Sequence, residues 1–147
     1  MEIKKKRLIE DIKLFNEDID AKKLEVFDID QLKVIEEMLM FGVDMIDFFS
    51  VNLYTPDQMS EILDAVRLGL DYDVLLNQNM NGLQLRILKY GLQMGIDISK
   101  YNDYRFDWDQ MYQIYYGLVS GIDVSSYADY NIPVLDMIKI RKQLMAA

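Results

Sequence analysis

The stretch FDWDQMYQIYYGLVSGIDVSSYADYN, residues 106–131, has relatives of itself immediately upstream in the same chain. A glutamine marks each copy, and eleven residues later comes a glycine, followed two residues on by an aspartate. The glutamines are Gln31, Gln58, Gln84 and Gln110, spaced by 27, 26 and 26 residues. Self-similarity at a fixed period predicts a repeat architecture.

Each copy opens with a signal for the start of a helix. The residues three before the glutamines are Asp28, Thr55, Asn81 and Asp107. Such side chains cap helix N-termini, and a glutamine three residues later completes a capping box. An apolar stripe at helical spacing then runs to the glycine, which favours the left-handed conformation that ends a helix. A fifth copy begins more weakly, with Pro133 and Asp136 in the two positions.

Every unit is therefore predicted to be a helix of about 13 residues, a turn, and a shorter helix of about two turns capped by the aspartate. Gly91 and Gly117 lie within the longer helices, where we expect them to mark close helix–helix contacts. Residues 1–26 are predicted to be a degenerate copy, with Asn16 in the position of the left-handed glycine. Ile9 keeps a core position there, while Lys6 and Lys13 replace apolar residues.

The sequence thus predicts an all-α protein. Its expected architecture is an α-solenoid of four to five tandem two-helix repeats with an N-terminal degenerate helical cap. As a single helical-repeat domain it divides into the cap 1–26, the repeats 27–54, 55–80, 81–106 and 107–132, and the C-terminal helix 133–147.

Composition narrows the chemistry. The 147 residues include no cysteine and no histidine, which excludes disulfides, thiolate metal sites and imidazole acid–base catalysis. No run approaches 18 apolar residues, so we expect no membrane span and a cytoplasmic location. The net charge is −9, with −12 concentrated in residues 26–136, which disfavours nonspecific binding to duplex DNA and allows a basic partner.

Most aspartates of residues 26–136 occupy capping positions or first helical turns, where negative charge suits the helix dipole. We therefore predict no metal, no cofactor and no enzymatic activity, although an enzyme that uses carboxylates alone stays open as an alternative. The simplest reason for the acidic composition is solubility.

The copies differ along one stripe, formed by positions two before and two, five and nine after each glutamine. This stripe becomes aromatic in the fourth copy, and Trp, Tyr and Arg dominate protein–protein hot spots. An acidic row on another side of the helices would suit a basic groove in a partner, or it is a solvated surface. The predicted partner-binding residues are Trp108, Tyr112, Tyr115, Arg86, Lys89, Arg67, Asp64 and Asp109.

The stripe has two alternative roles that stay open. In the first, its aromatic part is covered by the final residues or by self-association, as in a homodimer. In the second, the stripe is a basic and aromatic track for single-stranded nucleic acid, which the acidic surroundings disfavour.

Residues 106–131 resemble a helical repeat of uncharacterised proteins from Gram-positive gut bacteria, their phages and their mobile elements. The shared frame is F-(D/N)-W-x-Q-M-x-x-I-x-x-G-L-x-x-G-(L/I/V)-D-(V/I)-S-x-Y-A-(D/N), and the resemblance covers about residues 27–144. It implies an interaction repeat without catalytic residues. Small acidic phage proteins of this sort include inhibitors of host defence, anti-CRISPR proteins among them.

Together these observations predict a non-enzymatic protein-binding module. The expected partner is a basic nucleic-acid-binding enzyme, for which the resemblance implies a host defence nuclease blocked by a phage or mobile-element inhibitor. The alternative is a self-associating structural repeat protein.

Overall fold

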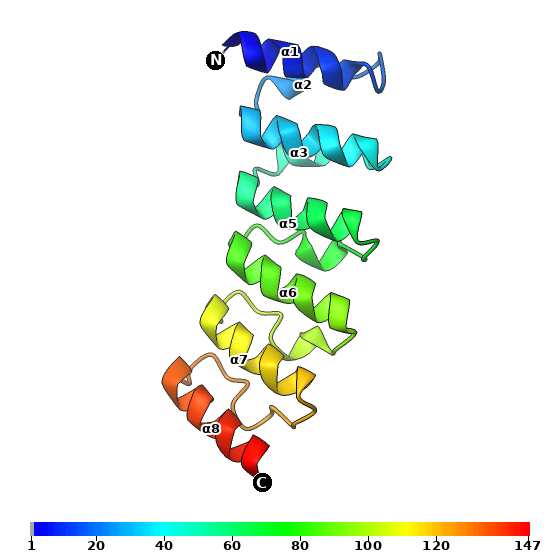
Figure 1. Cartoon of the computed structure of the whole chain (residues 1–147). Helices are drawn as coiled ribbons and strands as arrows, with labels where there is room; N and C mark the ends of the chain where they lie inside the picture. The colour runs from blue at the N-terminus through cyan, green and yellow to red at the C-terminus, as the bar shows by residue number, and fades with distance from the viewer. Residues whose placement is uncertain (1) are drawn as a thin grey trace. The chain divides into compact units, whose positions relative to one another are not determined.

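The computed structural model describes residues 2–147, and these residues form helices and turns with no β-strand (Figure 1). The long helices are α1 (Glu2–Lys13), α3 (Ile29–Met40), α5 (Pro56–Arg67), α6 (Gly82–Met94), α7 (Trp108–Val119) and α8 (Val134–Ala146). The short elements are α2 (Ala21–Leu24), α4 (Ile46–Val51) and the 3-10 turns η1 (Asp73–Leu75) and η2 (Ile98–Lys100). The prediction of an all-α protein is confirmed.

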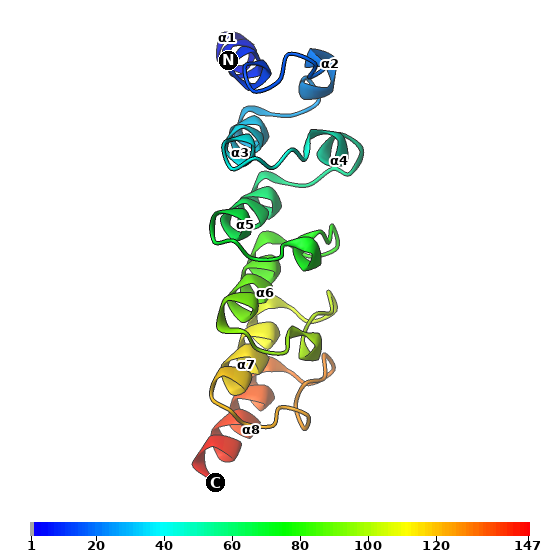
Figure 2. The same cartoon turned by 90° about the vertical axis from the view of Figure 1, so that its right-hand side faces the viewer.

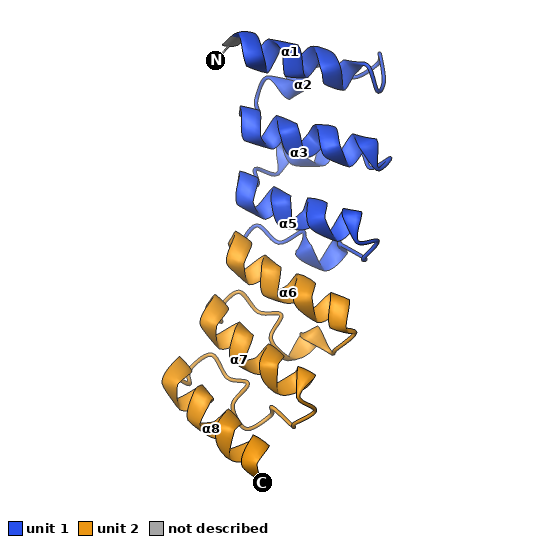
Figure 3. Ribbon diagram, viewed as in Figure 1, with its two compact units in different colours: residues 1–78 blue, residues 79–147 orange. Residues whose placement is uncertain are grey.

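The chain divides into two compact units, residues 1–78 and 79–147, which are described separately (Figure 3). In the first unit α1 packs on α3, α3 packs on α5, and α2 packs on α4. In the second unit α6 packs on α7 and α7 on α8. Within each unit the long helices lie in one layer and the short elements in another (Figure 2). The division lies next to the predicted boundary between repeats 55–80 and 81–106.

The predicted helix starts are confirmed. Asp28, Thr55, Asn81 and Asp107 each accept a hydrogen bond from the backbone N–H of the glutamine three residues later, and that glutamine's Oε1 accepts from the cap's N–H. These bonds are 2.7–3.2 Å long. Helix α8 begins after Pro133 without a side-chain cap, as its weaker start signal predicted.

The predicted ends of the long helices are also confirmed. Gly42, Gly69, Gly95 and Gly121 have φ between +67° and +79°, and a Cβ built on any of them would meet no atom within 4 Å. Glycine is therefore needed there for its backbone conformation and not for space. The prediction for Asn16 is wrong, because in residues 2–147 only glycines have positive φ. Its Oδ1 instead accepts from the N–H of Asp18 at 3.0 Å in a tight turn.

The predicted second helix of about two turns is wrong for most copies. Only α4, with six residues, comes near it, while η1 and η2 are single 3-10 turns and the segment after α7 has turns alone. In this last segment Asp123 Oδ1 accepts from Ser125 N–H at 3.0 Å, and Asp129 Oδ1 accepts from Asn131 N–H at 2.9 Å. These side chains take the backbone donors locally, which competes with continuation of a helix.

The glutamine of each capping box also bridges to the segment that leads into the next copy. Gln84 Nε2 donates to the carbonyls of Tyr104 and Phe106 at 3.1 and 2.6 Å. Gln110 Nε2 donates in the same way to Tyr130 and Ile132 at 3.0 and 2.8 Å. One amide therefore satisfies backbone groups at the start of its own helix and at the end of the segment that leads to the next long helix.

The same bridge recurs in the first unit. Gln31 Nε2 donates to Tyr54 O at 2.7 Å, and Gln58 Nε2 donates to Gln78 O at 3.2 Å. In α1 the position of the glutamine is taken by Lys5, whose Nζ donates to Glu25 O at 2.8 Å. Lys5 reaches the carbonyl twenty residues onward, as Gln58, Gln84 and Gln110 do, so α1 and α2 keep this one bond of the repeat.

Gly91 and Gly117 make close contacts, though not with another long helix as predicted. The return segment is the stretch between one long helix and the next. Each glycine contacts a fully buried tyrosine of the return segment that follows it, and a Cβ on either glycine would lie 2.1 Å from that tyrosine's hydroxyl. Tyr101 donates to Ile87 O at 3.1 Å, and Tyr127 donates to Gln113 O at 2.9 Å. The corresponding positions of the first unit hold a larger helix residue and a smaller partner, Ala65 and Leu75, both fully buried.

This size complementarity makes Gly91→Ala destabilising by about 1–3 kcal/mol, because the added methyl group meets the Tyr101 hydroxyl. In a Tyr101→Leu background, which copies the Ala65 and Leu75 combination, the same change should be neutral or stabilising by up to about 1 kcal/mol through helix propensity. Urea unfolding of the four proteins of this double-mutant cycle measures the difference. An equal cost in both backgrounds would contradict the pairing.

The buried tyrosines also predict a loss of stability in alkali. Burial raises the pKa of Tyr127 to about 12, with the positive charge of Arg141 opposing the effect. The unfolded side chain ionises near pH 10, so this stabilisation is complete below about pH 10 and is lost as the pH rises towards 12. Urea midpoints between pH 8 and 11.5 should fall less steeply for Tyr127→Phe than for the wild type. Parallel curves would show that Tyr127 ionises as a solvated phenol.

Candidate partner-binding surface

Helix α7 presents an aromatic stripe to solvent. Trp108, Tyr112, Tyr116 and Val119 are 43%, 38%, 38% and 41% exposed, and their spacing of four, four and three residues places them on one side of the helix. The opposite side carries the residues that α7 buries, including Met111 and Ile114. Polar side chains usually occupy the exposed face of such a helix, so this α7 surface is unusual.

Neighbouring tyrosines hold the exposed rings in place. The ring of Tyr112 lies 6.0 Å from that of Tyr115 and 6.2 Å from that of Tyr116, between centroids. Tyr115 is half-buried and lies 6.1 Å from Tyr90 of α6. Such tilted and edge-to-face contacts are favourable, so the rings are ordered before any partner arrives.

Helix α8 borders this tyrosine cluster and covers one face of the Tyr116 ring. The Arg141 guanidinium lies 4.3 Å above the Tyr116 ring, and its Nε donates to Gln113 Oε1 at 2.8 Å. Arg141 is thereby fixed as one edge of the surface, and Met145 beside it is exposed. Within the second unit, the final helix therefore leaves Trp108, Tyr112 and Tyr116 open to solvent.

Of the eight predicted partner-binding residues, Trp108 and Tyr112 lie on this exposed surface, and Tyr115 supports it from a half-buried position. Arg86 is exposed on α6, and Asp109 is half-buried in the first turn of α7. The prediction that Lys89 lies on an accessible stripe is wrong, since its side chain is only 5% exposed.

Lys89 occupies the position five after the glutamine, which is also buried in the preceding copy, where it holds Leu63. Arg67 and Asp64 belong to the first unit, where Arg67 forms an ion pair with Glu37. These two residues therefore lie in a different unit from the aromatic surface. Tyr116 was not among the predicted residues, although its interval of four residues from Tyr112 indicates that both lie on the same side of the helix.

The net negative charge of the protein lies in the first unit. Residues 1–78 contain nine basic and eighteen acidic side chains, whereas residues 79–147 contain seven of each. The aromatic surface thus lies in a unit without net charge, and the acidic surroundings inferred from the sequence belong to the first unit. The first unit would therefore repel nucleic acid, while the second unit has no net positive charge to attract it.

Residues 2–147 contain no group of three or more acidic side chains arranged to hold a metal ion. None of the helices in the same range is long and apolar enough to cross a membrane. The function has to be argued from the surface itself, because comparison of the chain with protein-family models, with curated proteins and with solved structures finds no match.

Proposed function

We propose that this chain is a non-enzymatic, protein-binding helical-repeat module and that the aromatic surface of α7 contacts the partner. The observation that supports this most directly is the exposure of Trp108, Tyr112 and Tyr116 on one side of a helix whose other side is buried. Large aromatic side chains provide most of the energy at protein interfaces. Rings that are already packed against one another lose little conformational freedom on binding.

A protein partner suits this surface better than single-stranded nucleic acid does. Nucleic acid needs a continuous row of free cations beside the stacking rings. In the second unit Lys89 is buried, and Arg141 is held over Tyr116 and against Gln113. The unit also has equal numbers of acidic and basic side chains.

We also propose the α-solenoid of four to five repeats as the architecture that displays this surface. Its support is the glutamine bridge, which recurs with the same chemistry in both units. In addition, the 26-residue interval from Thr55 to Asn81 continues the period in the sequence past residue 78. In such an array the repeated core positions are fixed, and the outward positions are free to vary.

For the partner we propose a basic nucleic-acid-binding enzyme, such as a host defence nuclease. The first unit, with twice as many acidic as basic side chains, would complement the electrostatic surface of such an enzyme. The resemblance of residues 106–131 to repeats of phages and mobile elements favours the same partner class.

Self-association is the second candidate function, because the second unit is neutral and two copies would not repel one another there. Sedimentation velocity at micromolar concentration separates the two. A monomer is expected, whereas a dimer that Trp108→Ala and Tyr112→Ala together dissociate would favour the structural role.

Replacing Trp108 and Tyr112 together by Ala should weaken partner binding by roughly 100- to 1,000-fold, since hot-spot aromatics contribute about 2 kcal/mol or more each. The partner is to be captured from host extract with the wild-type chain, identified by mass spectrometry, and its affinity measured with purified protein. Tyr104→Ala is the matched control, because Tyr104 is 55% exposed but lies outside α7.

The control variant should bind as the wild type does, and circular dichroism should show the same helix content for all three proteins. Wild-type affinity in the double variant would rule out the α7 surface as the contact.

A further inference from the structure

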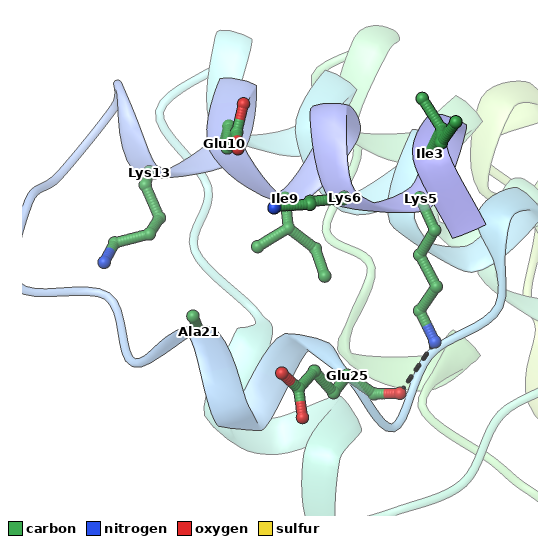
Figure 4. Close-up of a pocket in the computed structure, with 8 residues that line it drawn as sticks. All are labelled: Ile3, Lys5, Lys6, Ile9, Glu10, Lys13, Ala21 and Glu25. Carbon is green, nitrogen blue, oxygen red and sulfur yellow. Dashed lines mark hydrogen bonds between the residues drawn. The ribbon is translucent and has the colours of Figure 1, made fainter.

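A groove of about 660 Å³ lies between α1 and α2 in the first unit (Figure 4). Ile9 points from α1 towards α2, with Lys13 on one side and Lys5 on the other, and Ala21 and Glu25 of α2 form the opposite wall. Ile9 is half-buried. Lys6 and Glu10 of α1 also line the groove, so its floor is apolar and its rim carries three lysines and two glutamates.

Aligning α1 with the other long helices indicates what can pack on the side of α1 that lines the groove. Because Lys5 occupies the glutamine position, Lys6, Ile9 and Lys13 occupy the apolar stripe of the long helix. The same stripe positions in α3 are Leu32, Ile35 and Leu39, and the first two are almost fully buried where α3 packs between α1 and α5. The α1 stripe therefore has the spacing on which a further helix packs, with lysine in two of its three positions.

Charge identifies the helix that would fit. Helix α1 carries five basic and three acidic residues, whereas the rest of the first unit, residues 14–78, carries four basic and fifteen acidic. Lys6 lies three residues before Ile9 and Lys13 four residues after it, so both cations flank the apolar floor on one side of the helix. A complementary helix would place an apolar side chain over Ile9 and carboxylates beside the two lysines.

A second copy of this chain is a poor occupant. Stacking α8 of another copy on α1, which would extend the repeat array, brings together two helices with net positive charge, since α8 carries three basic residues and one acidic. The acidic helices α3 and α5 already bury their apolar stripes within the first unit. Helix α7 exposes an aromatic stripe but carries only one carboxylate, that of Asp109, which is too few to pair with both lysines. The complementary helix is therefore assigned to a different protein.

We propose that the groove between α1 and α2 is a docking site for an acidic amphipathic helix of a partner protein. The helix lies along α1, covers Ile3 and Ile9, and pairs its carboxylates with Lys6 and Lys13. Ile3, which is 77% exposed, becomes covered in the complex. This site lies in a different unit from the aromatic surface of α7 and does not depend on it.

The test uses the full chain and a synthetic 18-residue peptide held in a helix by a covalent staple, with leucine at intervals of three and four residues, glutamate at the positions beside Lys6 and Lys13, and alanine elsewhere. Amide NMR shifts induced by the peptide should map to α1 and α2, and affinity should fall several-fold between 50 and 300 mM salt. Lys6→Glu with Lys13→Glu should weaken binding at least tenfold, while Lys6→Arg with Lys13→Arg should retain it within about twofold.

A second variant separates binding from folding. Ile3→Ser leaves the core intact because the side chain is exposed, and it should reduce peptide affinity several-fold through the lost apolar contact. The α7 variant with Trp108→Ala and Tyr112→Ala should bind the peptide as the wild type does, so failure of either proposal is distinguishable from failure of the other.

Several results would overturn the docking site. These are undiminished binding to the charge-reversed chain, equal binding of a peptide with lysine in place of glutamate, and shifts that map to α7. Binding of dodecanoate but not of the peptide would reassign the groove to an anionic amphiphile. Self-association that the charge reversal abolishes would reassign it to a second copy of the chain.

Discussion

A primary amide in each repeat satisfies backbone groups on both of its sides. Its oxygen accepts from the N–H of the residue that caps its own helix, and its nitrogen donates to carbonyls of the segment entering the next copy. Backbone groups at a helix start and in a turn have no regular partner, and leaving them buried without one is costly. Glutamate would lack the donor and lysine the acceptor. Lys5 accordingly keeps only the bridge, and α8, with Asp136 in this position, begins without a side-chain cap.

Because the glutamine, the terminal glycine and the apolar stripe are committed to the start, the end and the buried side of each long helix, the remaining helix positions are free to differ. In α7 these positions are aromatic, and the rings pack on one another while staying exposed. In α1 two positions of the apolar stripe itself are lysine, which gives the first unit a cationic edge on an otherwise acidic body. We therefore expect the functional residues at positions that differ between the copies and not at positions that the copies share.

The sequence was sufficient where a structural role depends on neighbours in the chain. The caps at Asp28 and Asp107 and the left-handed glycines followed from local chemistry, and all were confirmed. The return segments were predicted wrongly because an aspartate that caps a helix and one that closes a tight turn have the same signature. The burial of Lys89 follows from the packing of the whole fold, and the glutamine bridge joins residues twenty or more positions apart, so no local pattern reports either. For the aromatic surface, the sequence identified Trp108 and Tyr112 but could not show that Tyr115 supports them from beneath.

Gln110→Glu tests the amide bridge most directly, because it keeps the oxygen that completes the capping box and removes the donor that reaches Tyr130 and Ile132. Gln110 is buried, so the carboxylate would face two carbonyl oxygens with little access to water. The free energy of unfolding in urea at pH 7 should fall by at least about 2 kcal/mol. A change within about 0.5 kcal/mol, the range of an ordinary surface substitution, would show that the copies are held together by apolar packing and that the amide acts only as a cap.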